Sequence, residues 1–191
     1  MSVTDNTVVR YRMDASRSRF VVQAFADGLL SVFGHNPTIA ICGFGGDARF
    51  DLSTLEKASL LMLVTPDSFT VVDKVSDKDR REIERAMRED VLEIARYPEI
   101  VFMSKKTSAH PIAEGQHRVK ITGDLTLHGV TREHEIDANV TFNQDTLSAQ
   151  GEFSLRQTDY NIKPVSIAGG TLKVKDELQF SFDIQAQKEE G

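Results

Sequence analysis

The sequence is poor in several features that would define its chemistry. It has a single cysteine, Cys42, which excludes an intrachain disulfide and a zinc site built on several cysteines. Its longest apolar run is Leu60–Val64, far below the ~20 residues of a membrane-spanning helix, so we expect no stable membrane insertion. Basic residues number 23 against 29 acidic ones, and this balance argues against binding of nucleic acid.

Motifs for catalysis and metal binding are also missing. The chain has no His-Glu-x-x-His, Gly-x-Ser-x-Gly or Walker motif, and its histidines show no known metal-ligand spacing. We therefore predict no metal, no cofactor and no catalytic residue. The N-terminus shows no secretory signal peptide, so we expect a cytoplasmic protein.

The residues that are present fit one folded domain spanning residues 1–191. The length leaves room for one well-filled core, and 40% hydrophobic and 27% charged residues are near globular averages. The second half shows the strict period-two alternation of half-buried antiparallel strands, from Val119, over Val130–Phe142, and from Leu172 to Ala186 with an interruption at Asp176. Shorter strand candidates are Val8–Met13, Phe20–Ala26, Thr38–Cys42, Asp47–Leu52, Ala58–Thr65, Ile100–Lys105 and Leu147–Gln157.

Turn signals separate these strands, and one segment predicts a substantial helix. The helix is expected over Asp77–Arg96, with Ser76 as its N-cap and Pro98 after its end. Its narrow apolar stripe consists of Ile83, Met87, Val91 and Ile94. Expected hairpin turns are Gly43–Gly46, Gly115, His128-Gly129, Asn143–Asp145 and Gly169-Gly170.

Many short alternating strands with one helix predict a mainly β fold, either an antiparallel barrel or a sandwich. Strand length favours the barrel. A strand such as His117–Leu127 would be about 36 Å long at ~3.3 Å per residue, which suits an elongated barrel. A barrel of about eight strands either encloses one slender apolar ligand or is filled by its own side chains.

Four stretches spread over nearly the whole chain carry a recognisable pattern. They are Asp14–Phe20 with Phe33-Gly-His-Asn-Pro37, then Tyr97–Ser104, then Gly123–Arg132, and last Phe153–Ile162 with Lys173–Glu177. Together they resemble the YceI family of lipocalin-like barrels, whose third motif reads G-x-L-T-hydrophobic-x-G-V-T-R. Members often carry a tryptophan in the first strand; this chain has Tyr11 near that position. The resemblance implies a lipocalin-like β-barrel that holds a long-chain isoprenoid or related lipid.

Alternating apolar side chains would line the tunnel for such a ligand. Burial alone suffices for tight binding, because each CH₂ transferred from water contributes about 0.8 kcal/mol. The alternative is that the same side chains fill a solid core. The candidate lining residues are Phe20, Val22, Phe50, Leu60, Met62, Phe102, Ile121, Leu125, Ile136, Phe153, Leu155, Phe180 and Phe182.

A polar anchor for a lipid headgroup is the second expected part of the site. Arg132 and His134 share a strand face with apolar residues, where charge is costly unless it is paired or near an opening. A solvated strand end explains them as well. Arginine and lysine suit the phosphate of a prenyl phosphate, and His35 lies in a turn between two strands. The candidate headgroup residues are His35, Arg132, His134, Arg156 and Lys163.

We therefore expect binding of a long-chain apolar ligand inside the barrel, for storage, transport or stress protection, without catalysis. Two alternatives stay open. A barrel with a closed core would act as a protein-interaction or homodimerisation module through its helix or an edge strand. An enzyme acting on a hydrophobic substrate would use His35 or His134 as acid or base.

Overall fold

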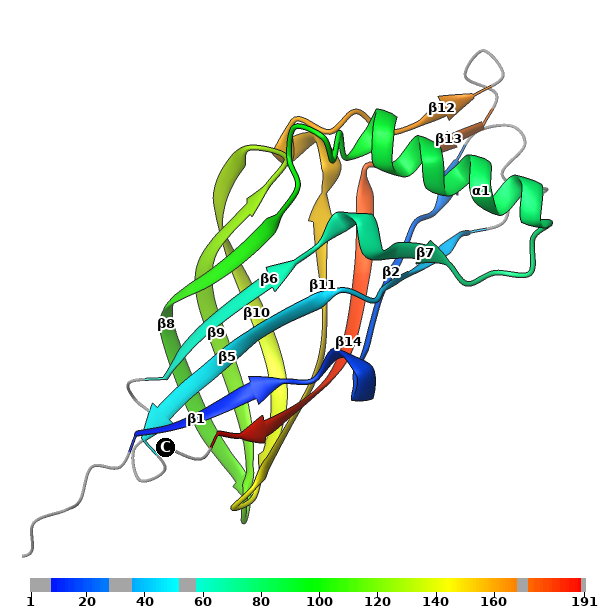
Figure 1. Cartoon of the computed structure of the whole chain (residues 1–191). Coiled ribbons are helices and arrows are strands. Elements are labelled where there is room, and N and C mark those ends of the chain that lie inside the picture. Colours follow the sequence, from blue (N-terminus) through cyan, green and yellow to red (C-terminus); the bar gives the residue numbers. More distant parts are fainter. Residues whose placement is uncertain (1–7, 28–35, 52–57, 168–171, 190–191) are drawn as a thin grey trace, which may run out of the picture.

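The computed structural model describes residues 8–27, 36–51, 58–167 and 172–189, which fold mainly into strands. Eight strands close into an antiparallel barrel, because the last strand of the series pairs with the first (Figure 1). The fold class expected from the sequence is thereby confirmed. In order around the barrel the strands are β1 (Val8–Met13), β5 (Phe44–Asp51), β6 (Ser59–Val64), β8 (Ile100–Ala113), β9 (Gln116–Leu127), β10 (Val130–Phe142), β11 (Thr146–Arg156) and β14 (Glu177–Lys188).

Strand β14 divides one of its edges between two partners. Its C-terminal part pairs with β1, and its N-terminal part pairs with β2 (Arg19–Gln23). From β2 the sheet continues through β4 (Thr38–Ile41) to β7 (Phe69–Val71). A small second sheet combines β12 (Ser166–Ile167), β13 (Leu172–Val174) and β3 (Ala26–Asp27). In the described ranges, three 3-10 helices connect strands, namely η1 (Ala15–Arg17), η2 (Pro66–Ser68) and η4 (Gln157–Tyr160).

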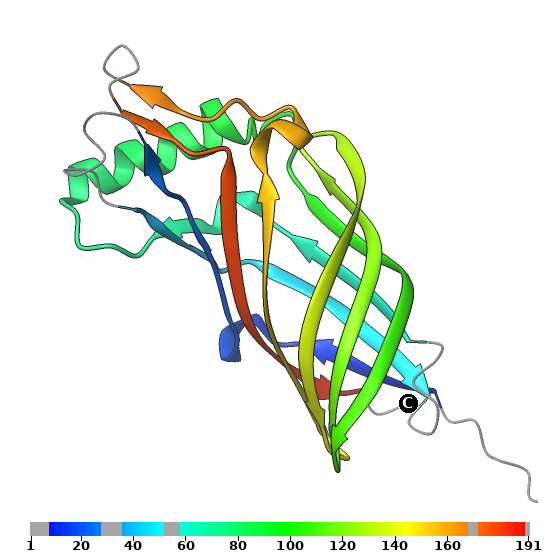
Figure 2. The same ribbon diagram turned by 180° about the vertical axis from the view of Figure 1, so that it is seen from behind.

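One helical segment lies across an end of the barrel, and we call this the helix end (Figures 1 and 2). It comprises α1 (Asp77–Ala86), capped by the Ser76 side chain, and a π-helical turn, η3 (Met87–Val91). The turns between β8 and β9 and between β10 and β11 gather at the opposite end, the hairpin end. Within the described ranges, no helix combines the length and apolar character that crossing a bilayer requires.

The helix is fastened to the edge strand β7 by side chains one turn apart. Glu84 accepts hydrogen bonds from the Thr70 hydroxyl at 2.6 Å and the Val71 amide at 3.0 Å. Arg80 donates to the Val71 carbonyl oxygen. An edge strand presents unpaired backbone groups, so these side chains satisfy groups that a further strand would otherwise pair.

Residues of three sequence motifs meet at the helix end. The ring nitrogens of His128 lie 2.7 Å from a Glu93 carboxylate oxygen and 3.2 Å from the Tyr160 carbonyl oxygen. Gly129 has a positive φ of 74°, and a Cβ there would lie 2.6 Å from the Tyr97 ring. Only glycine fits comfortably at position 129. The close contact with Tyr97 therefore joins the tyrosine and the His128-Gly129 turn in one cluster.

Three expectations about elements need correction. The helix ends at Val91, not Arg96, because the π-helical turn is followed by a left-handed residue, Glu93, with φ of 45°. Gly43–Gly46 is not a hairpin turn, since β5 starts at Phe44 and pairs with β1 and β6. The segment from Leu172 is two strands that belong to different sheets. Asp176 lies between them, and its backbone carbonyl oxygen accepts a hydrogen bond from the backbone N–H of Gln157.

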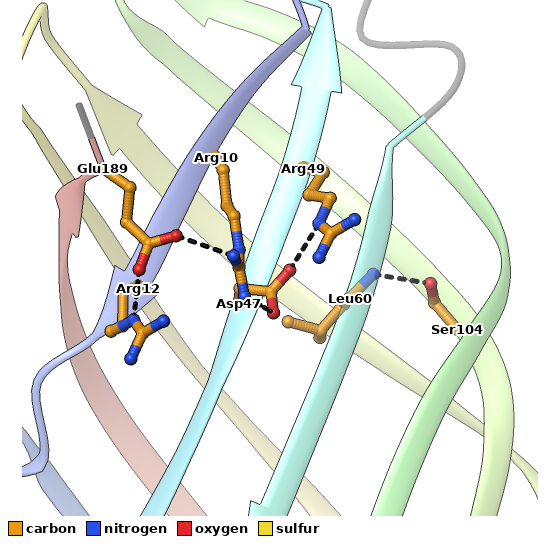
Figure 3. Close-up of polar contacts among 7 residues, drawn as sticks. All are labelled: Arg10, Arg12, Asp47, Arg49, Leu60, Ser104 and Glu189. Atoms are coloured by element: carbon orange, nitrogen blue, oxygen red, sulfur yellow. Dashed lines mark hydrogen bonds and ion pairs between the residues drawn. The ribbon is translucent and has the colours of Figure 1, made fainter. Parts of the chain in front are cut away.

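The outer surface of the barrel carries ion pairs where the inner surface is apolar. On β1, Arg10 pairs with Asp47 at 2.9 Å and with Glu189 at 2.8 Å, while Arg49 contacts the same aspartate at 2.8 Å (Figure 3). The next residue on β1, Tyr11, points to the opposite face and is fully buried. Period-two alternation thus separates solvated charges from the interior.

Candidate functional site

The interior of the barrel is hollow, with a cavity volume of about 1030 Å³. All eight barrel strands contribute inward-facing side chains to its wall, together with β2, β4 and the helix. The cavity reaches the surface beside the helix, because the exposed side chains of Asp79, Glu82 and Asp90 form part of its rim. This volume is at the upper end of the range for pockets that bind small molecules.

Each of the thirteen predicted lining residues lies on the wall of this cavity. Several of them keep accessible surface although they point inward, notably Leu60, Ile136, Phe153 and Phe180. In a solid core such side chains would be buried on all sides. The alternation accounts for the direction in which these side chains point, and ligand contact at these residues stays a prediction.

Phenylalanine rings dominate the part of the wall formed by β2, β11 and β14. Phe20 contacts the rings of Phe44, Phe153, Phe180 and Phe182 at centroid distances of 5.9 to 6.4 Å. Phe153 and Phe180 stack with centroids 4.7 Å apart and an interplanar angle of 3°. All of these rings except Phe44 line the cavity with apolar faces and edges, which suits a flexible hydrocarbon chain.

A second ring cluster closes the cavity toward the hairpin end. Tyr11 stacks on Phe50 at 5.4 Å, and Phe50 contacts Phe142 at 5.5 Å. Phe142 stacks in turn on His117 at 5.2 Å. The Tyr11 hydroxyl donates to the Asn143 carbonyl oxygen at 2.9 Å, so its polar tip is satisfied. Burial raises the pKa of this hydroxyl, which keeps it protonated as a donor.

The predicted headgroup residues are dispersed. His35 lies outside the described residues. Arg156 and Lys163 are exposed and are absent from the cavity wall. Arg132 shares a strand face with His134, but its Nε donates to the Asp159 carbonyl oxygen at 2.5 Å. Both Arg132 and Asp159 are exposed. A long side chain near a strand end reaches solvent in this way, which was the simpler explanation of its position.

Of the four predicted headgroup residues that the structure describes, His134 is the one that lines the cavity. Its ring meets Phe153 edge-on, with centroids 5.2 Å apart and an interplanar angle of 69°. Burial lowers its pKa below the ordinary value of 6.5, because desolvation disfavours the charged imidazolium. The side chain is therefore a neutral hydrogen-bonding group inside an apolar wall at neutral pH.

Sequence reasoning missed other parts of the wall. His117 lines the cavity two positions before Val119, so extending the alternation of that strand would have placed it there. Ile83 and Met87 come from the helix, whose apolar stripe was recognised but not assigned to the cavity. Among the described residues, no group of three or more His, Cys, Asp or Glu side chains is arranged to hold a metal ion.

Comparison with known proteins identifies relatives of the whole fold. A family model described as YceI-like domain matches residues 11–186. A UPF0312 protein of Vibrio parahaemolyticus is 30% identical over 96 residues, which are 50% of this chain and 45% of that protein. In such matches the chain spans about half the length of its curated relatives.

Two solved structures share the fold. BcnA of Burkholderia cenocepacia superposes with a TM-score of 0.68 at 18% identity, covering 91% of this chain and 98% of that one. A polyisoprenoid binding domain from Saccharophagus degradans, implicated in plant cell wall breakdown, gives a TM-score of 0.65 at 13% identity, covering 93% and 97%. At these identities the likeness concerns the architecture of the barrel.

Proposed function

The chain belongs to the YceI-like domain family, and we propose that its barrel binds one long-chain apolar ligand, an isoprenoid or a related lipid. The observation that carries this proposal is the continuous apolar cavity of about 1030 Å³ inside the barrel. The description of the Saccharophagus degradans neighbour as a polyisoprenoid binding domain supports the same class of ligand. The role we propose is storage, transport or protection of that ligand, without a chemical reaction. A cytoplasmic location and a homodimer stay predictions.

Native mass spectrometry of freshly purified protein tests this function directly. We expect an added mass that, after denaturation, is released and identified as a prenyl or acyl lipid. A bare polypeptide that also fails to bind added prenyl lipids would contradict the proposal and favour an interaction module.

A pair of neighbouring variants on β11 localises the binding. Ala149 lines the cavity, whereas Gln150 is exposed on the outside. In Ala149→Phe the new ring replaces roughly three ligand methylene groups at about 0.8 kcal/mol each, so affinity should fall about 50-fold. Gln150→Phe should leave affinity unchanged. Equal affinities in the two folded variants would place the ligand outside the barrel.

A further inference from the structure

His134 occupies an unusual position in the tunnel wall. Its neighbour Ile136 on the same face of β10 is apolar, and its ring packs against Phe153. The residue opposite it on β9 is Gly123, which offers the imidazole no side chain. The ring is therefore accessible from the cavity and surrounded mainly by hydrocarbon.

The Nε2 atom of His134 is buried and has no hydrogen-bond partner among the described residues. Buried polar atoms are nearly always paired in folded proteins, because an unpaired one loses its hydration without compensation. Protein atoms cover this nitrogen, so it does not face the open cavity. The ring itself lines the cavity, and among the described residues its other nitrogen, Nδ1, makes no hydrogen bond. A ligand oxygen at this level would pair with Nδ1, or with Nε2 after rotation of the ring.

The charged residues on the cavity wall indicate which kind of ligand atom would pair with His134. A neutral imidazole has one donor and one acceptor nitrogen, and it matches a hydroxyl or carbonyl oxygen. Among the described lining residues the cationic side chains are Arg85 and Lys173. Arg85 is paired with Glu89 at 2.9 Å, and Asp79, Glu82 and Asp90 contribute negative charge to the rim. The described wall thus offers no concentration of positive charge for a phosphate.

We propose that His134 determines specificity by hydrogen-bonding an uncharged oxygen of the ligand inside the tunnel. This inference rests on the proposed function and defines its ligand further. The barrel then prefers apolar chains bearing a hydroxyl or carbonyl group over the corresponding hydrocarbon and over prenyl phosphates. The polar group of the ligand lies within the barrel, beside β10.

Three matched probes test the preference: geranylgeraniol, the hydrocarbon that lacks its hydroxyl, and geranylgeranyl phosphate. Their affinities are measured by displacement of a fluorescent prenyl probe. One hydrogen bond inside an apolar wall predicts that the wild type binds the alcohol roughly tenfold more tightly than the hydrocarbon. The ring nitrogen signals of His134 in NMR spectra should shift with the alcohol and not with the hydrocarbon.

Variants assign the preference to one residue. His134→Phe should remove the tenfold preference while it retains binding of the hydrocarbon, and His134→Gln should restore part of it, because an amide also donates and accepts. His110→Leu is the control, since this histidine is exposed on β8. His117→Leu tests the second inward histidine, whose Nδ1 is also buried without a described partner. His117 pairs with Val140, six residues along β10 from His134, so it lies about 20 Å deeper.

Each outcome separates this inference from the proposed function. If none of the probes binds, both fail. If alcohol and hydrocarbon bind equally in the wild type, or the preference survives in His134→Phe, the tunnel binds lipid but His134 does not select it. Loss of the preference in His117→Leu alone would place the polar contact at the hairpin end, and tighter binding of the phosphate would overturn the uncharged headgroup.

Discussion

The two ring clusters of the barrel differ in how completely they are packed. The cluster at the hairpin end contains Tyr11, which is fully buried, and Phe50, which is 5% exposed. In the cluster around Phe20, the rings of Phe153 and Phe180 keep part of their surface accessible from the cavity. Phe142 and His117 at the hairpin end are half-buried and also line the cavity, and Phe20 in the other cluster is buried. The contrast is therefore between single rings: Tyr11 lies in the packed core, whereas Phe153 and Phe180 face the cavity.

This difference indicates that some rings mainly stabilise the barrel and others mainly contact a ligand. A closely packed cluster with a satisfied hydroxyl contributes mainly to the free energy of unfolding. Rings that face empty space lose dispersion contacts that a ligand would restore. We therefore expect substitution of Tyr11 to affect stability most, and substitution of the half-buried rings around Phe20 to affect binding as well.

Tyr11→Ala should give the largest effect. The substitution removes a buried ring that stacks on Phe50 and a hydrogen bond to Asn143, so we expect a loss of about 3–5 kcal/mol in the free energy of unfolding. Urea denaturation measures it. Tyr11→Phe keeps the ring and should cost only about 0.5–1.5 kcal/mol. A Tyr11→Ala loss below that of Tyr11→Phe would contradict the assignment of Tyr11 to the packed core.

Phe153→Ala should have an intermediate effect on stability and a clear effect on binding. The ring stacks on Phe180 but is only half-buried, so we expect a loss of about 1–3 kcal/mol in the free energy of unfolding. Affinity for a prenyl probe should fall at the same time, because the ligand loses an aromatic contact. A stability loss equal to that of Tyr11→Ala, with unchanged affinity, would remove the distinction between the two clusters.

Local alternation made most of the wall predictable. Strands β1 and β10 have the bounds expected from the sequence, and all thirteen lining candidates face the cavity, because side-chain direction along a strand depends only on period two. The left-handed pair His128-Gly129 forms the turn between β9 and β10, as its residue types indicated.

Features that depend on distant partners were not predictable in this way. The division of β14 between β1 and β2 depends on register between strands far apart in the sequence. Arg132 follows the alternation of its strand, yet its guanidinium binds the carbonyl oxygen of Asp159, which only the folded chain brings near. The role of the helix in the cavity likewise follows from its attachment to β7.

Loosening of the helix from β7 is the smallest predicted effect on stability, and it is confined to the helix end. Hydrogen bonds from the Thr70 hydroxyl and the Val71 amide hold the pKa of Glu84 below its ordinary value of 4.5. A carboxylate with a lowered pKa in the folded state stabilises the protein above its unfolded pKa, and this contribution is lost as the pH falls through the folded value. Acidification below about pH 4.5 should therefore loosen the helix from β7 before the barrel unfolds.

Hydrogen exchange of individual amides measures this loosening. The Val71 amide, which donates to Glu84, should exchange faster on acidification than amides of β1 after correction for the intrinsic pH dependence. Glu84→Gln keeps an accepting oxygen without the charge, so it should cost about 1 kcal/mol at neutral pH and reduce the acid response. Glu89→Gln, an exposed carboxylate of the same helical segment, is the control. An acid response unchanged in Glu84→Gln would show that another group fastens the helix, and equal exchange at β7 and β1 would mean that both ends open together.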